Sequence, residues 1–170
     1  PTYFDEMPIS KSDVVSASQT SRTAVIFIGR AMGESMDNKA KKGYYYLTNE
    51  EKKLIDLVTS VFSKTVIVID AGNIIDLSWT IEYGCKIGAI VYAFQGGMES
   101  GNALIDILYG DVTPSGKLTD TIAIKYNDYP ASGNFGNAKQ NVYEEDIYVG
   151  YRHFETFAKD KVMYPFGFGL

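Results

Sequence analysis

The residues best suited to acid/base chemistry lie in one loop. Glu34 stands between Gly33 and Ser35, shortly after an apolar run, and Asp37 follows in the same loop. Small flanking residues allow backbone N–H groups to hold a carboxylate and bring it close to a ligand, which suits a general acid or base. The alternative is that both acids are solvated, because most Asp and Glu side chains in proteins are exposed.

Predicted regular elements bound this loop on both sides. The β-branched run 23–28 predicts a strand buried on both faces of a parallel sheet. Thr48 and Glu51 have the spacing of a capping box, which predicts the start of a helix. The loop from Arg30 to Leu47 exceeds the ~12 to 15 residues above which connections in compact domains are uncommon. In open α/β sheets, ligands bind beyond the carboxyl ends of the strands, so we expect this loop to be functional.

Strands and helices alternate along the rest of the first two thirds of the chain. Ser10, followed by Asp13, predicts the N-cap of an early helix, and apolar residues at helical spacing predict a second helix over 54–62. Further segments predict strands at 65–70 and 89–94, an irregular helix at 75–83 and a helix at 103–109. Three strand–loop–helix units predict right-handed crossovers and a mostly parallel sheet with helices on both faces. The expected fold class is α/β, a three-layer α/β/α sandwich.

The pattern is weaker beyond Gly110. A short strand is expected within 118–124 and a polar loop over 127–140. Ile147, Val149 and Tyr151 alternate with other residues, which predicts a strand with one buried face. With 170 residues, 45% of them hydrophobic, the chain is expected to form one domain over residues 1–170.

Composition argues against several classes of partner. A net charge of −5 does not favour nucleic acid or an anionic membrane surface, since both attract basic proteins. The longest apolar runs have the length of strands, so no membrane span is expected. His and Cys residues do not cluster at metal-ligand spacing, and we expect no metal or other cofactor. Cys85, the single cysteine, is interpreted as a small buried hydrophobe.

Two common catalytic motifs do not fit. Gly110 to Lys117 differs from a phosphate loop, because five residues rather than four separate Gly110 from Gly116. A serine hydrolase needs a G-x-S-x-G elbow, which the sequence lacks, and its one histidine, His153, is interpreted as packing in an aromatic strand. The glycine-rich turn 95–101 follows a predicted strand, which leaves a flavodoxin-like nucleotide-binding domain as an alternative.

Six motifs, taken together and in order, resemble the second domain of glycoside hydrolase family 3. They are Gly33-Glu34 with Asp37-Asn38 and Lys42-Gly43, then Tyr45-Tyr46-Leu47-Thr48, then Gly97 to Ala103, Gly110 to Leu118, Tyr143 to Arg152 and Tyr164 to Leu170. The similarity runs from about Thr23 to the end of the chain. Ser35 and Asn38 stand where the family motif has Gly and Arg.

The resemblance implies a function and a set of site residues. Family members are typically retaining β-glucosidases and related exo-acting β-glycosidases, in which a TIM-like barrel supplies an Asp nucleophile and the sandwich domain closes over the sugar. It implies that Glu34 is the general acid/base and that Asp37, Asn38 and Tyr45 contact a carbohydrate substrate. It also implies a catalytic barrel of the same polypeptide as partner, so we expect this chain to be one excised domain, inactive alone.

Two other functions remain open on the sequence. One is a non-catalytic module that binds sugar or supports the barrel, with the acid/base in another domain. The other is the nucleotide-binding domain mentioned above.

Overall fold

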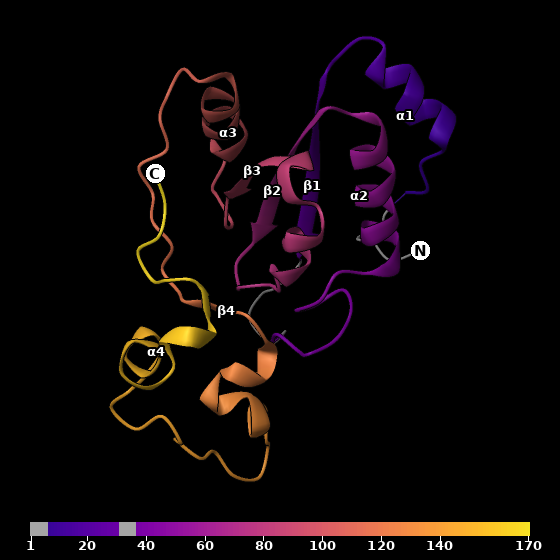
Figure 1. Ribbon diagram of the computed structural model, residues 1–170. Coiled ribbons are helices and arrows are strands. Elements are labelled where there is room, and N and C mark those ends of the chain that lie inside the picture. The colour runs from indigo at the N-terminus through magenta and orange to yellow at the C-terminus, as the bar shows by residue number, and fades with distance from the viewer. Residues whose placement is uncertain (1–6, 31–36) are drawn as a thin grey trace. The chain divides into compact units, whose positions relative to one another are not determined.

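The computed structural model describes residues 7–30 and 37–170 (Figure 1). Its contacts divide the chain into two compact units, Pro1–Asn73 with Trp79–Met98, and Ile74–Ser78 with Glu99–Leu170. The first unit holds the parallel sheet and the loop of interest. The second holds two helices and a small antiparallel pair of strands.

The first unit is built on a three-stranded parallel sheet. Its strands are β1 (Thr23–Arg30), β2 (Lys64–Ala71) and β3 (Ile87–Tyr92), in the order β1-β2-β3. Two short 3₁₀ helices, η1 (Ser78–Glu82) and η2 (Gly84–Lys86), precede β3 where an irregular helix is expected. The α/β class with a parallel sheet is therefore confirmed.

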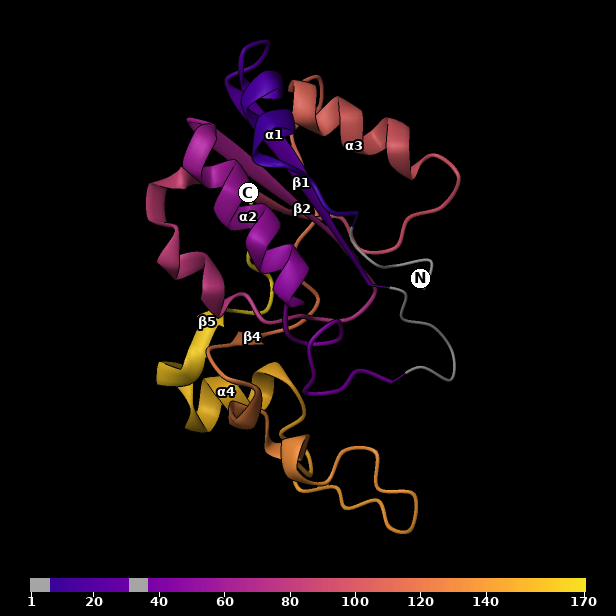
Figure 2. The same cartoon turned by 90° about the vertical axis from the view of Figure 1, so that its right-hand side faces the viewer.

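Two helices lie on one face of this sheet. They are α1 (Lys11–Ser18) and α2 (Asn49–Val61), and Figure 2 shows α2 running along β1 and β2. The side chains of Ser10 and Thr48 accept the predicted N-cap hydrogen bonds, and both capping boxes are complete. Each cap satisfies backbone N–H groups that a helix start leaves without an intrahelical partner, which is why the helices begin where the sequence predicts.

Burial differs between the strands, and this corrects one expectation. In β2, the consecutive residues 67–69 are each 0% exposed, so this central strand is buried on both faces as predicted. In β1, Ile26 and Ile28 are buried, whereas Val25 is 42% and Phe27 53% exposed. The prediction that β1 is buried on both faces is wrong. β1 is an edge strand, and in the order β1-β2-β3 both right-handed crossovers fall on the same face, that of Ile26 and Ile28.

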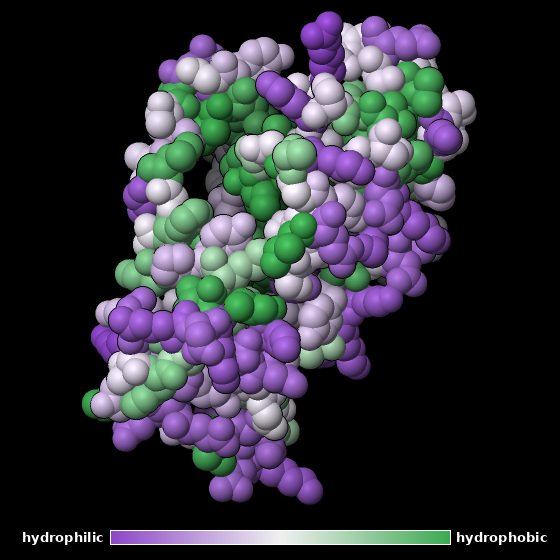
Figure 3. Space-filling model, in the orientation of Figure 1, coloured by the Kyte–Doolittle hydropathy of each residue, from purple (hydrophilic) through white to green (hydrophobic). Residues whose placement is uncertain are grey.

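The second unit has a small core of its own. It contains α3 (Ser100–Tyr109), α4 (Tyr151–Phe157) and the antiparallel strands β4 (Ile122–Ala123) and β5 (Val162–Tyr164). Ala123, Phe154 and Ala158 form the buried cluster, against which Tyr129 packs with its ring edge-on to Phe154 at 5.6 Å. The remaining elements are η3 (Tyr126–Asp128), η4 (Pro130–Gly133) and η5 (Lys159–Lys161). Hydrophilic residues predominate at the surface of the stretch that follows η4 (Figure 3).

Several other predictions differ from the structure. The alternation at 147–151 does not form a strand, because Tyr151 begins α4 after Gly150, whose φ is +60°. Five alternating residues are too few to separate a strand from a turn followed by a helix, and His153 consequently lies on α4. Cys85 is exposed in η2 rather than buried. The predicted strand at 118–124 is shorter than expected, at Ile122–Ala123.

Tyr83 ties the segment between β2 and β3 to α2. Its hydroxyl donates a hydrogen bond to Asp56 Oδ1 at 2.7 Å, and its ring meets Trp79 edge-on at 6.0 Å. Burial and the bond to the Asp56 carboxylate raise the pKa of Tyr83 from 10.0 to about 12. Because the folded state favours the neutral phenol, this contribution to stability is complete below pH 10 and is lost as the pH rises toward 12.

We therefore expect Tyr83→Phe to destabilise the protein by about 0.5–1.5 kcal/mol at pH 7 through loss of the hydrogen bond. The difference in unfolding free energy between wild type and variant should shrink as the pH rises from 10 to 12. Urea unfolding over this range measures it. Tyr109→Phe is the control, because Tyr109 is 80% exposed. A difference that stays constant with pH would contradict the prediction.

Candidate functional site

The loop that contains Glu34 leaves the carboxyl end of β1 and enters α2. Arg30 is the last residue of β1 and Thr48 is the N-cap of α2. Glu34 itself lies outside the described residues, as do its neighbours Gly33 and Ser35. The structure describes the loop from Asp37 onward.

A buried ion pair joins the two elements that bound the loop. Arg30 is 6% and Glu51 4% exposed, and the two side chains meet through two parallel contacts. Arg30 Nη1 donates to Glu51 Oε1 at 2.5 Å, and Arg30 Nη2 donates to Glu51 Oε2 at 2.9 Å. Bidentate arginine–carboxylate pairs form charge-assisted hydrogen bonds, which are stronger than those between neutral groups. We call the pair the Arg30–Glu51 clamp.

Each partner of the clamp also holds backbone. Arg30 Nε donates to the carbonyl oxygen of Tyr44 at 2.9 Å, and Nη2 donates to that of Tyr46 at 3.4 Å. Glu51 Oε2 accepts the backbone N–H of Thr48 at 2.7 Å, which completes the capping box of α2. The clamp thus fastens the end of β1, the returning part of the loop and the start of α2 to one another.

The returning part of the loop is a compact turn stabilised by backbone hydrogen bonds. Gly43 N–H donates to the carbonyl oxygen of Tyr46 at 2.9 Å, and Tyr46 N–H donates to that of Lys41 at 3.1 Å. Tyr45 N–H donates to the carbonyl oxygen of Lys39 at 3.1 Å. Gly43 has a φ of +80°, a conformation that L side chains rarely adopt. Residues 39–47 therefore have a definite conformation.

The predicted substrate-binding residues occupy different environments. Asp37 is exposed, and Asn38 is half-buried with its side-chain oxygen accepting the N–H of Lys39 at 2.9 Å. Tyr45 is 1% exposed and packs edge-on against Tyr46, with 5.1 Å between ring centroids. Asp37 and Asn38 thus lie near each other in sequence and are accessible, whereas Tyr45 belongs to the packed interior. A contact between Tyr45 and a sugar stays a prediction.

The sequence prediction did not pair Arg30 with Glu51, although Arg30 stands at the end of a predicted strand and Glu51 in a predicted capping box. The carboxyl end of a strand and the amino end of the helix that follows it lie at the same edge of a parallel sheet. An arginine at the first position and a capping glutamate at the second are therefore brought to one edge, where burial forces the two charges to pair. The pairing cannot be inferred from sequence spacing, because the long loop separates Arg30 from Glu51 in the chain.

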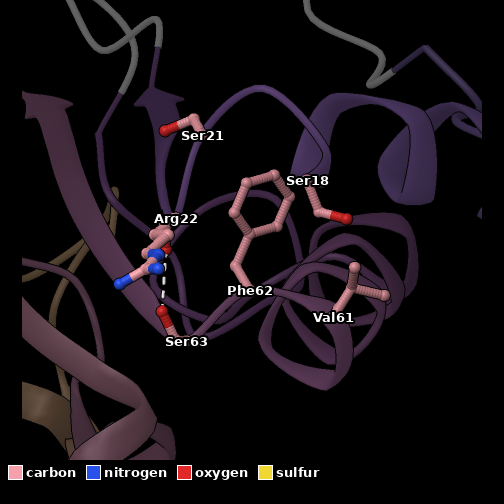
Figure 4. Close-up of a pocket in the computed structure, with 6 residues that line it drawn as sticks. All are labelled: Ser18, Ser21, Arg22, Val61, Phe62 and Ser63. Atoms are coloured by element: carbon pink, nitrogen blue, oxygen red, sulfur yellow. Dashed lines mark hydrogen bonds between the residues drawn. The ribbon is translucent and has the colours of Figure 1, made fainter.

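A shallow pocket lies at the other edge of the sheet. Its lining is Ser18, Ser21, Arg22, Val61, Phe62 and Ser63 (Figure 4). Ser63 Oγ donates to the carbonyl oxygen of Arg22 at 3.1 Å, shown as the dashed line in that figure. These residues precede β1 and β2, so the pocket is at the amino ends of the strands, where α/β sheets rarely bind ligands.

The described residues offer neither a metal-binding cluster nor a membrane-spanning helix. Among residues 7–30 and 37–170, His, Cys, Asp and Glu side chains form no group of three that could hold a metal ion. In the same residues, each helix is too short or too polar to cross a bilayer.

The comparison with protein families identifies the chain. Residues 8–151 match the model of the glycosyl hydrolase family 3 C-terminal domain. The chain belongs to this family. The resemblance inferred from the six motifs is thereby confirmed.

Named relatives of this family 3 domain are β-glucosidases. The chain is 48% identical to a β-glucosidase of Ruminococcus albus over 170 residues, which is all of this chain and 18% of that protein. A crystal structure of a β-glucosidase from Paenibacillus barengoltzii matches 98% of this chain and 18% of its own, with a TM-score of 0.94 and 48% identity. β-Glucosidase 3B of Thermotoga neapolitana, in complex with glucose, matches 95% of this chain and 23% of its own, with a TM-score of 0.84 and 35% identity.

This family 3 domain corresponds to only a part of each of those enzymes. The chain spans about a fifth of the length of the β-glucosidases that it matches. At 34% to 48% identity over almost the whole chain, the likeness extends to the sequence as well as to the fold.

The clamp gives a prediction for stability. We expect Arg30→Met to destabilise the domain by about 3–5 kcal/mol, because it leaves the Glu51 carboxylate buried without its cation. The double variant Arg30→Met/Glu51→Gln should recover most of the loss, since Gln removes the charge and can still cap α2. Urea unfolding measures both.

The control for this experiment is Lys52→Met, which breaks the Lys52–Glu82 ion pair. The side chains of that pair are 46% and 64% exposed, although their separation is only 2.7 Å. Its loss should cost about 1 kcal/mol or less. Equal effects of Arg30→Met and Lys52→Met would contradict the role given to the clamp.

Proposed function

We propose that this domain is part of a larger β-glycosidase, a β-glucosidase in the first instance, that removes terminal β-linked sugars. In this proposal Glu34 is the general acid/base, and a barrel of the same polypeptide supplies the nucleophile. The observation that carries the proposal is the position of the 30–47 loop at the carboxyl end of β1, in a chain whose named relatives are β-glucosidases. Ligand sites of α/β sheets form at that edge.

The chemistry requires two carboxyl groups of different function. A retaining glycosidase places them ~5–5.5 Å apart, one ionised to attack the anomeric carbon and one protonated to release the leaving oxygen. Glu34 would donate the proton to that oxygen and then remove a proton from the water that hydrolyses the glycosyl-enzyme. Such a division of labour needs a carboxyl group held in a fixed position.

The described part of the loop offers groups that are suited to bind a sugar. Asp37 and Asn38 lie three and four positions after Glu34 in the sequence, and Asp37 is exposed and Asn38 half-buried, so their side chains can form hydrogen bonds with hydroxyl groups. Half-buried Tyr44 and Tyr46 offer aromatic surface in the same turn. Asn38 in place of the family's Arg offers an amide instead of a charge at that position.

A nucleotide-binding role has less support. The N-cap of α3 is Glu99, whose carboxylate lies at the helix start and accepts a hydrogen bond from Asn102 Nδ2 at 2.5 Å. An anionic side chain there disfavours a phosphate, which binds helix N-termini through the positive end of the dipole. The non-catalytic alternative, in which the acid/base belongs to another domain, is an outcome of the experiment below.

The proposal predicts a dependence on the leaving group when Glu34→Ala is introduced into the full-length enzyme that carries this domain. We expect kcat/KM for an aryl β-glucoside with a poor leaving group to fall ~10²- to 10⁴-fold, because its oxygen needs a proton to depart. The value for a good leaving group should change little. Azide should raise kcat on the good leaving group by attacking the glycosyl-enzyme without a base.

Glu155→Ala is the matched control, because Glu155 is an exposed residue of α4 whose carboxylate pairs with Lys159 Nζ at 3.3 Å. This variant should leave kcat/KM unchanged for both substrates. Equal, small losses on both substrates in Glu34→Ala would instead make this loop a binding or structural element and assign the acid to another domain.

A second prediction concerns the chain alone. We expect the isolated 170 residues to release no detectable product from an aryl β-glucoside, because no residue matches the family's Asp nucleophile. A companion assay adds the separately expressed barrel to the isolated chain and measures release of product from the same aryl β-glucoside. Turnover by the isolated chain, at a rate that survives repurification, would contradict the two-domain mechanism.

A further inference from the structure

We propose that residues 143–151, in the second unit, form a docking surface for the catalytic barrel of the same polypeptide. The proposal rests on the proposed function, because that function places a barrel in the full-length protein. It does not depend on which residue is the general acid. We call residues 143–151 the docking segment.

The docking segment exposes apolar side chains in succession. Ile147 is 68% and Val149 53% exposed, and Tyr148 and Tyr151 are 37% and 40% exposed. Single exposed apolar residues are common on protein surfaces, whereas a run of three or four is unfavourable unless it serves a function. The alternation at 147–151 predicts one buried face, and the part of the chain that the structure describes leaves that face open. A partner outside this chain would bury it.

Backbone hydrogen bonds hold the docking segment in a definite conformation. Tyr148 N–H donates to the carbonyl oxygen of Glu145 at 2.8 Å, and Arg152 N–H donates to that of Val149 at 3.3 Å. Asp146 has a φ of +49°, in the left-handed region, which residues other than glycine seldom adopt. A surface that is formed before docking loses less conformational entropy on association.

Two aromatic pairs join the docking segment to the rest of the second unit. The ring of Tyr148 meets that of Phe157 edge-on, with 4.8 Å between centroids, and Tyr151 stacks on Phe166 at 4.6 Å. Phe157 and Phe166 are themselves exposed, so each pair adds a second apolar ring to the surface. Aromatic residues are enriched at protein–protein interfaces, whose fully buried centre is more apolar than the remaining surface.

Acidic side chains border the apolar run on its amino-terminal side. Glu144, Glu145 and Asp146 are consecutive, and among the described residues no Lys or Arg forms an ion pair with them. A complementary partner therefore presents an apolar patch beside basic side chains, because opposite charges across an interface select partner and orientation. A second copy of the same surface would add the same acids to the interface, which disfavours self-association.

The size of the relatives indicates what covers the docking segment. The chain spans about a fifth of their length, so most of such a polypeptide lies outside this structure. In the proposed mechanism the barrel must stay close to this domain, since the acid and the nucleophile act on one sugar from two domains. A fixed separation between them needs a firm contact between the domains, and a preformed apolar surface is suited to provide it.

The first test is photo-cross-linking in the full-length enzyme that carries this domain. Benzoylphenylalanine replaces Tyr143, which is 82% exposed at the amino end of the docking segment. We expect irradiation to join this position to a peptide of the barrel, identified by mass spectrometry of a digest. Tyr109, 80% exposed on α3, is the matched control position and should give no barrel cross-link. Cross-links from position 143 only to another domain or to a second copy, no cross-link, or equal barrel yields at both positions would overturn the proposal.

The second test introduces a charge into the proposed contact. Val149→Asp places a carboxylate where docking would remove it from water, which is costly. We expect kcat/KM to fall about 10- to 100-fold on both aryl β-glucosides, because a loosened contact displaces this whole side of the site. The uncharged variant Val149→Thr should retain most of the activity. Val112→Asp is the matched control, since Val112 is 52% exposed in the same unit, and it should leave kcat/KM unchanged.

The substrate dependence separates this proposal from the proposed function. Equal losses on both substrates in Val149→Asp, beside selective loss in Glu34→Ala, would support both. No loss in Val149→Asp, or the same loss in Val112→Asp, would overturn the docking surface and leave the role of Glu34 intact. Barrel cross-links from position 143 without selective loss in Glu34→Ala would retain the docking surface and assign the acid to another domain.

Discussion

The buried ion pair between Arg30 and Glu51 is the constraint around which the first unit of this domain is arranged. It joins the end of β1 to the first turn of α2, across a loop that would otherwise add freedom to both. Removing one partner leaves the other charge buried and unpaired, which destabilises the fold more than removing both partners together. The same contacts that complete the helix cap also fix the returning turn of the loop.

The order of the strands determines where such a loop can lie. Because the strands are parallel and in the order β1-β2-β3, the carboxyl ends of β1 and β2 lie at the same end of the sheet. Right-handed crossovers in this order place the connecting helices on one face of the sheet. The loop at 30–47 emerges at the first of these positions. The shallow pocket lined by Arg22 and Ser63 lies at the opposite edge, which separates it from the chemistry proposed here.

The family relationship gives this arrangement its context. A chain that spans about a fifth of the length of its β-glucosidase relatives contributes one side of a site in the mechanism proposed here. The physical requirement on that side is rigidity, because an acid that serves a nucleophile on another domain must be held from its own scaffold. The Arg30–Glu51 clamp fixes the last residue of β1, the turn at 39–47 and the start of α2 to one another within one βα unit.

Local sequence patterns determined most of the framework. Both capping boxes, the parallel strands and the long loop follow from spacing that acts over a few residues, and the six family motifs identified the relatives. Where the pattern was short the prediction failed, since the alternation at 147–151 fits a turn and helix as well as a strand. Cys85 likewise gave no signal of its exposure.

Only the tertiary structure decided the pairing of Arg30 with Glu51 and the burial of Tyr45. The ion pair joins residues 21 positions apart that meet at one end of the sheet, and a local sequence pattern does not specify which distant residues come together. The burial of Tyr45, at 1% exposed, likewise depends on how the turn at 39–47 packs. The exposed face of β1 has the same cause, because strand order, and not the composition of the strand, decides which face the crossovers cover.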